Sequence, residues 1–143
     1  MNPAFPPIRV SAGIITKGLR LFICQRRSHD LHALKWEFPG GKAEPYEDEA
    51  ACLQRELREE LSIEATIGQV LQRTSHSYPN GREVSLTFLH VPTYTGEIVN
   101  RQFQAFVWVT PSELPLYDFL EGDRDFVGAL ASGEWSWIFL PHC

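Results

Sequence analysis

Three glutamates at helical spacing are the residues of this sequence best suited to chemistry. Glu56, Glu59 and Glu60 lie in segment 50–61, which also carries leucines at helical intervals. Helical residues three and four positions apart share a face, so the carboxylates are expected along the rim of an apolar stripe. Such like charges repel unless a cation compensates them, and hard oxygen ligands favour Mg²⁺ or Mn²⁺ over zinc. A solvated acidic face would show the same spacing, so the surrounding residues must separate the two interpretations.

The residues around these glutamates form a longer pattern. Gly41 is followed after five residues by Glu47, and after seven more by the run RELREELSI at 55–63. This pattern resembles the signature of the Nudix hydrolases and departs from it at Ser62, where the family usually has glycine. The matched residues would recur by chance in such a chain on the order of once in a million. Ser62 is expected at the helix end, in the left-handed conformation that glycine adopts with less strain.

The resemblance implies roles for the residues of the metal site. Glu56, Glu59 and Glu60 would bind the metal, with one of them also serving as base, and Arg55 would orient Glu56 through an ion pair. Segment 36–42, WEFPGGK, is similar to the segment that precedes the signature in MutT-like members, and this likeness makes the Gly40 carbonyl a further metal ligand. Gly41 belongs to the same loop. Glu47 is expected at the helix start, where an acidic side chain opposes the helix dipole, or near the metals.

Four further residues are expected to contact the substrate. Arg26 aligns with a basic residue that contacts the nucleotide in MutT-like enzymes; the alternative is a solvated loop arginine. Asp123 aligns with a position that reads the base edge, where a carboxylate suits an amino group such as that of cytosine or guanine. The alternative for Asp123 is a plain helix N-cap. Phe38 lies in the WEFPGGK segment, and Phe119 either stacks on the base or packs in the core.

One departure from the MutT-like pattern has a chemical consequence. Gln102 stands where related proteins usually carry a glutamate that adds a carboxylate to the metal cluster. Its amide oxygen can coordinate a metal, but it brings no charge and cannot act as a base. Glu97 lies nearby in the sequence and could substitute if the loop is rearranged. The sequence therefore predicts a metal site with weaker affinity or fewer ions.

The elements that position these residues follow from hydrophobic periodicity and turn residues. Strands are expected over 8–16, 19–25, 67–78, 83–91 and 103–110, with a helical turn at 111–114 and a final helix over about 123–131. His76 and His90 are isolated, so both are expected to be structural. Together with the resemblance, this order predicts an α/β/α Nudix fold, a mixed β-sheet sandwiched between helices.

Composition and charge limit the class of protein. The 143 residues are expected to form one domain, with a loose lead-in at 1–7 and an apolar tail at 134–143 that either packs across the domain or forms a self-association surface. A net charge of −5 argues against binding long nucleic acid. The three cysteines, Cys24, Cys52 and Cys143, lack a CxxC spacing and are expected to be reduced. Without a signal peptide or membrane-length apolar run, the predicted location is cytoplasmic.

The functional prediction joins the residues to the resemblance. Carboxylates beside a glycine loop suit metal-assisted substitution at phosphorus. The resemblance implies Mg²⁺-dependent cleavage of (deoxy)nucleoside triphosphates, including oxidised or modified ones such as 8-oxo-dGTP, to NMP and pyrophosphate by a monomer or homodimer. One alternative is hydrolysis of another nucleoside diphosphate-linked compound. A second is a non-catalytic nucleotide-binding sensor, which Gln102 and Ser62 favour and the complete set of Arg55 and three glutamates opposes.

Overall fold

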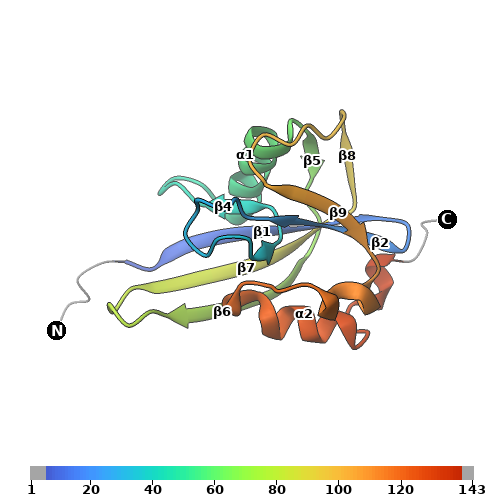
Figure 1. Cartoon of the computed structure of the whole chain (residues 1–143). Coiled ribbons are helices and arrows are strands. Elements are labelled where there is room, and N and C mark those ends of the chain that lie inside the picture. Colours follow the sequence, from blue (N-terminus) through green and yellow to red (C-terminus); the bar gives the residue numbers. More distant parts are fainter. Residues whose placement is uncertain (1–5, 140–143) are drawn as a thin grey trace.

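A central sheet separates two helices in the computed structural model of the protein, which describes residues 6–139. Helix α1 covers one face of the sheet and α2 the other (Figure 1). The strands are β1 (Ile8–Lys17), β2 (Arg20–Gln25), β3 (Trp36–Glu37), β4 (Gly40–Lys42), β5 (Glu64–Thr66), β6 (Val70–Ser77), β7 (Glu83–Val91), β8 (Thr93–Thr95) and β9 (Ala105–Val109). The α-helices are α1 (Glu49–Leu61) and α2 (Arg124–Ala131), and the 3₁₀ helices are η1 (Pro111–Leu116), η2 (Glu121–Asp123) and η3 (Ser136–Phe139).

The main sheet is mixed. Its strand order is β3-β2-β1-β7-β6, with β4 also paired to β1 and β9 to β2. Strands β1 and β7 run parallel, with Ile8 opposite Val84 and Ile15 opposite Val91, whereas β1 pairs antiparallel with β2 and β4. Strands β5 and β8 form a separate antiparallel pair. The predicted α/β/α arrangement is confirmed.

Alternation along the central strands builds one core on each face of the sheet. In β2, Leu21 and Ile23 pack with the α2 side, while Phe22 and Cys24 pack with the leucines of α1. This is the period of two that a strand imposes on its side chains. A sheet that is buried on both faces holds the backbone of β1 rigidly, and β1 in turn supports the glycine loop.

Helix α1 is fixed at both ends by local chemistry. Its N-cap is Asp48, whose carboxylate accepts a hydrogen bond from the Ala51 amide at 2.7 Å. At the other end Ser62 has φ 59°, so the predicted left-handed conformation is confirmed. The Ser62 hydroxyl accepts a hydrogen bond from Arg101 Nε at 2.5 Å, which ties the helix end to loop 96–104. The three glutamates are thereby held at a defined rotation of the helix.

Several element boundaries differ from the sequence predictions. The expected strand 67–78 begins only at Val70, because the Gly68 amide leaves the regular ladder to reach the His90 carbonyl at 2.7 Å. Strand β9 starts at Ala105 instead of residue 103, and α2 starts at Arg124. The very short β3, β4, β5 and β8 were not predicted, because two or three residues are too few to show a hydrophobic period.

The described part of the tail packs across the domain. Ile138 and Phe139 are buried in the core on the α2 side, and the Trp135 ring lies 4.9 Å from the Phe126 ring. Residues 140–143, including Cys143, and residues 1–5 of the lead-in lie outside the described residues. His90 is buried with Nε2 2.8 Å from the Thr16 hydroxyl, which fits the structural role expected of it. No helix within residues 6–139 is long and apolar enough to span a membrane.

Candidate active site

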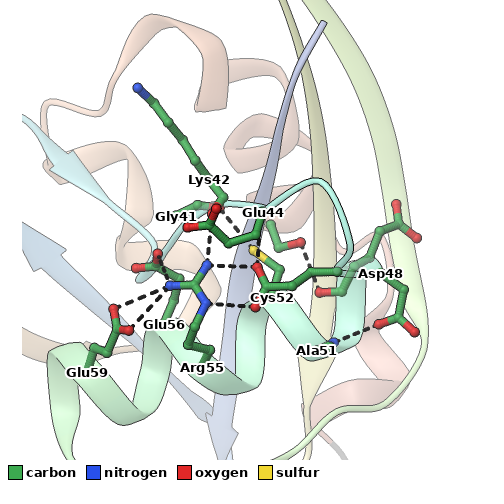
Figure 2. Close-up of polar contacts among 12 residues, drawn as sticks. Gly41, Lys42, Glu44, Asp48, Ala51, Cys52, Arg55, Glu56 and Glu59 are labelled. Carbon is green, nitrogen blue, oxygen red and sulfur yellow. Dashed lines mark hydrogen bonds and ion pairs between the residues drawn. The ribbon is translucent and has the colours of Figure 1, made fainter. Parts of the chain in front are cut away.

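Arg55 is the hub of the acidic cluster. Its Nε and Nη2 donate to the two carboxylate oxygens of Glu47 at 2.7 and 2.9 Å. Its Nη1 donates to Glu56 at 2.9 Å and, more weakly, to Glu59 at 3.3 Å. Figure 2 shows the Arg55 guanidinium lying between Glu56, Glu59 and the loop that precedes α1. The ion pair expected between Arg55 and Glu56 is present.

Glu47 anchors this hub to the loop. Its carboxylate also accepts a hydrogen bond from the Glu44 amide at 2.8 Å, and its carbonyl accepts one from Arg9 Nη1. The hydrogen bonds from Arg55 lower the pKa of Glu47 to about 2, so it is ionised throughout the neutral range. Since Asp48 caps the helix, Glu47 serves to hold Arg55 in place.

The two glycines of the loop allow close packing that a side chain would prevent. A Cβ on Gly40 would lie 1.9 Å from the Ser11 carbonyl oxygen, and Gly40 has φ 152°. A Cβ on Gly41 would lie 2.4 Å from the carboxyl carbon of Glu56. The Gly40 amide also donates to Glu60 at 3.0 Å. The backbone of β4 therefore cradles two of the three helix carboxylates.

Burial determines the protonation of these carboxylates. Burial and the neighbouring Glu56 raise the pKa of Glu60 to about 9, and burial raises the pKa of Glu56. Without a cation, the Glu60 carboxyl is therefore protonated at neutral pH. Carboxyl groups that resist ionisation together are typical of functional sites, and a bound cation would restore their charge.

The carboxylates of Glu56, Glu59 and Glu60 are neighbours on α1, but they do not converge on one point. Within residues 6–139, no three His, Cys, Asp or Glu side chains are already placed to hold one ion. Arg55 holds Glu59, which is more than half exposed, while Glu60 faces the Gly40 amide. Gln102 is exposed and lines a pocket that also borders Glu60. Glu97 is exposed and does not line this pocket. The compensation by Glu97 considered above therefore lacks support.

A pocket of about 570 Å³ opens beside Glu60. Its lining includes apolar residues of β1 and β7, residues of loop 26–35, the glycine loop and residues 120–124 at the start of α2. Pocket-lining residues expected from the sequence are Arg26, Phe38, Gly40, Gly41, Glu60, Gln102 and Asp123. The structure thus brings three of the four expected substrate residues and two expected metal ligands, Gly40 and Glu60, around one space.

Asp123 lines the pocket and also stands at the N-cap position of α2. Its side chain makes no capping hydrogen bond, so it lacks the contact by which an N-cap aspartate stabilises a helix. It is only 6% exposed, and burial with the nearby charge of Glu37 raises its pKa to about 7. A carboxyl of this kind can present either an acceptor or a donor to a ligand at neutral pH.

The remaining expected contacts divide between pocket and core. Arg26 is not a solvated arginine, since its Nη1 lies 3.2 Å from Glu37 and its Nε donates to the Leu31 carbonyl at 2.8 Å. Phe38 is 4% exposed at the pocket wall. Phe119 is 2% exposed, packs against Phe38 with ring centres 5.5 Å apart and does not line the pocket, so it has the core role.

Sequence reasoning missed several pocket residues. Glu37 belongs to the WEFPGGK segment but was given no role. A charged residue between Trp36 and Phe38 could have indicated a functional position. His76 and Tyr78 also line the pocket, with ring centres 4.8 Å apart. Because they are two residues apart in an expected strand, their side chains are predicted to lie on the same face of the sheet. Strand periodicity alone does not predict that this face lines a pocket.

We expect the metal-free protein to lose stability as pH rises from about 5 to 9, and Mg²⁺ to restore it. The folded-state pKa of Glu60, about 9, lies above its ordinary value of 4.5, so the unfolded chain releases this proton first. Glu56 and Asp123 act in the same direction. Melting temperatures at pH 5, 7 and 9, with and without Mg²⁺, test this expectation. A metal-free melting temperature that stays level or climbs over this range would contradict it.

The chain matches known proteins over most of its length. A model of the NUDIX domain matches residues 6–130. The CTP pyrophosphohydrolase of Escherichia coli K12 is 40% identical over 117 residues, covering 81% of this chain and 85% of that protein. The 8-oxo-dGTP diphosphatase of Haemophilus influenzae is 34% identical over 132 residues, covering 92% and 96%. The solution structure of the Escherichia coli ORF135 protein superposes with a TM-score of 0.80 at 36% identity, covering 90% of this chain and 91% of that one.

Proposed function

We propose, from the premise that this chain belongs to the Nudix hydrolase family, that it cleaves (deoxy)nucleoside triphosphates to a nucleoside monophosphate and pyrophosphate. The family makes it a hydrolase of acid anhydrides. We further propose that residues 1–143 form one such domain and that the reaction requires Mg²⁺ or Mn²⁺.

The observation that supports this proposal is the shared pocket of Glu60 and Asp123. The same pocket is lined by Glu60, a proposed metal ligand, and by Asp123, a buried group able to hydrogen-bond a base. A volume of about 570 Å³ falls within the range of small-molecule sites. A substrate with a base at one end and phosphates at the other matches this distribution of groups.

The residues of the site suit a metal-assisted attack by water at phosphorus. Glu56, Glu59 and Glu60 would hold the metal together with the Gly40 carbonyl, which the likeness of segment 36–42 to MutT-like members implies as a ligand. A bound Mg²⁺ would neutralise phosphate charge and make a bound water more acidic. Arg55 keeps Glu56 oriented, and one glutamate of the set accepts the proton of the attacking water. The P–O bond between the α- and β-phosphates breaks, releasing NMP and pyrophosphate.

The base preference is proposed to depend on Asp123. The two relatives named above are called after CTP and 8-oxo-dGTP, whose bases both carry an exocyclic amino group. An ionised Asp123 would accept a hydrogen bond from such a group. Oxidised or otherwise modified triphosphates of these two bases are therefore the preferred substrates that we propose.

Replacing Asp123 by Asn is expected to lower kcat/KM for the preferred triphosphate about tenfold to hundredfold, the usual range for losing one base-reading contact. Triphosphates whose base lacks an amino group at that position should change much less. Asp125→Asn, a change of an exposed aspartate two residues further on in α2, is the matched control. Steady-state kinetics over a base series make the comparison, and an equal loss for every base would show that Asp123 does not read the base.

Pyrophosphate release over a nucleotide panel tests the proposed reaction. The panel contains the common NTPs and dNTPs, 8-oxo-dGTP, 5-methyl-dCTP, ADP-ribose and a dinucleoside tetraphosphate, each with and without Mg²⁺. We expect one triphosphate to exceed the others, with NMP as the co-product. Preferential cleavage of ADP-ribose or of the dinucleotide would favour the alternative of another nucleoside diphosphate-linked substrate. Background rates for every compound would refute the proposal.

A further inference from the structure

We propose that Glu37 is a positioning residue that holds the Arg26 guanidinium toward the phosphate chain of the substrate. The inference rests on the proposed function and extends it to a residue for which no role has been assigned above. Both side chains line the pocket beside Glu60. Arg26 would contact the nucleotide, whereas Glu37 would act only through Arg26.

The backbone around Glu37 is fixed on both sides. Strand β3 pairs with β2, where Glu37 lies opposite Cys24. On its other side, the Trp36 amide donates to the Asp118 carbonyl at 2.9 Å, and the Leu120 amide donates back to the Trp36 carbonyl at 3.0 Å. Because the backbone of β3 is hydrogen-bonded on both sides, the short Glu37 side chain starts from a fixed position. Its carboxylate can therefore orient the longer and more flexible Arg26 side chain.

Two contacts orient the Arg26 side chain. Its Nη1 lies 3.2 and 3.3 Å from the two carboxylate oxygens of Glu37, and its Nε donates to the Leu31 carbonyl at 2.8 Å. Contacts at two different nitrogens fix the plane of a guanidinium. Because this group carries five N–H donors, others remain for a phosphate oxygen. Without Glu37, only the contact with Leu31 would hold the side-chain end.

The charge of Glu37 is electrostatically unfavourable in this pocket. Its side chain is 16% exposed, and its charge acts on both Asp123 and Glu60. A further carboxylate between these acidic groups is electrostatically unfavourable, and burial raises the pKa of Glu37 despite its arginine partner. The arrangement is explained if the carboxylate is retained to orient Arg26 in the pocket that Glu60 and Asp123 also line.

A double-mutant cycle on Glu37→Gln and Arg26→Ala tests this role. In Glu37→Gln we expect KM to rise about tenfold for every triphosphate, as expected for a weakened charge-assisted contact, with kcat within about threefold. In the Arg26→Ala background, adding Glu37→Gln should change KM by no more than about twofold, because the two residues act as one unit. Glu64→Gln, which breaks the exposed ion pair with Arg58, is the matched control.

Three results would overturn the inference. Multiplicative effects of the two substitutions would show that Glu37 acts independently of Arg26. A changed ratio of NTP to dNTP turnover, or a changed base order, would show that Glu37 contacts the nucleoside itself. An unchanged KM in Glu37→Gln would leave it without a role in binding.

A binding measurement separates this inference from the proposed function. The Kd of a triphosphate analogue with a methylene group between the α- and β-phosphorus atoms is measured by calorimetry on the same four proteins. If the unsubstituted enzyme releases no pyrophosphate, the proposed function fails, and the Kd cycle still decides whether Glu37 acts through Arg26. Melting temperatures should stay within a few degrees, because Gln has nearly the same shape as Glu.

Discussion

Glu60→Gln is expected to lower kcat on the order of 10³-fold, because a neutral amide cannot supply the charge that a metal site at phosphorus requires. The folded protein should survive the change. In the absence of a cation Glu60 is already protonated at neutral pH, with a pKa of about 9, and its oxygen accepts the Gly40 amide. A Gln oxygen can accept the same hydrogen bond. Without metal, the variant should therefore melt at a higher temperature than the unsubstituted protein at pH 8.

The combination of lost turnover and gained metal-free stability distinguishes a metal ligand from a structural residue. The measurements are kcat for the best triphosphate and melting temperature at pH 8 with and without Mg²⁺. Mg²⁺ should stabilise the unsubstituted protein and have much less effect on Glu60→Gln. Glu64→Gln, an exposed change just beyond the same helix, should alter neither quantity. If Glu60→Gln retained more than about a tenth of kcat, Glu60 would not hold an essential metal ion.

Helix α1 was the part of the candidate site most accessible to sequence reasoning. Its residues lie within one segment, so helical spacing alone places Leu53, Leu57 and Leu61 in the core and the glutamates beside them. The left-handed Ser62 and the pairing of Arg55 with Glu56 are equally local. Such features involve residues a few positions apart, and the contacts from Arg101 to Ser62 and from Arg55 to Glu47 support them.

The pocket was less accessible because its walls come from distant segments. The position of Asp123 fits both a helix cap and a base reader, and the missing capping hydrogen bond, which argues against a side-chain cap, is visible only in the structure. The isolated His76 lies on the pocket wall because the parallel pairing of β1 with β7 brings the β6–β7 hairpin beside segment 8–12. Likewise, Arg26 and Glu37 are 11 residues apart and meet only when β3 pairs with β2.

Two neighbouring glycines are expected to respond to the same substitution in different ways. In Gly40→Ala, the new Cβ would lie 1.9 Å from the Ser11 carbonyl oxygen, at a residue with φ 152° that L side chains rarely adopt. Both obstacles are backbone and cannot move cheaply. We expect the free energy of unfolding to fall by more than about 3 kcal/mol, with activity lost as a result.

In Gly41→Ala, the new methyl group would instead meet the end of a side chain. The atoms within 2.4 to 2.7 Å are those of the Glu56 carboxyl group, which can swing aside at low cost in stability. Once displaced, Glu56 leaves its place beside Arg55 and Glu60. We therefore expect a loss of at least about 100-fold in kcat and weaker activation by Mg²⁺, while the melting temperature changes little.

Denaturant unfolding and Mg²⁺ titrations of activity on both glycine variants test this contrast. Gly128→Ala, a change in α2 at which a Cβ would meet no atom within 4 Å, is the control for adding a methyl group. If Gly41→Ala kept full kcat, the position of the Glu56 carboxyl would not matter for the reaction. If both variants lost stability equally, both glycines of the loop would serve folding alone, and Gly41 would have no separate role in positioning Glu56. Low activity in a stable Gly41→Ala protein would instead mean that Gly41 is needed to position the Glu56 carboxylate. The Gly-Gly pair in the sequence does not reveal this requirement, because it depends on how closely α1 packs against the loop.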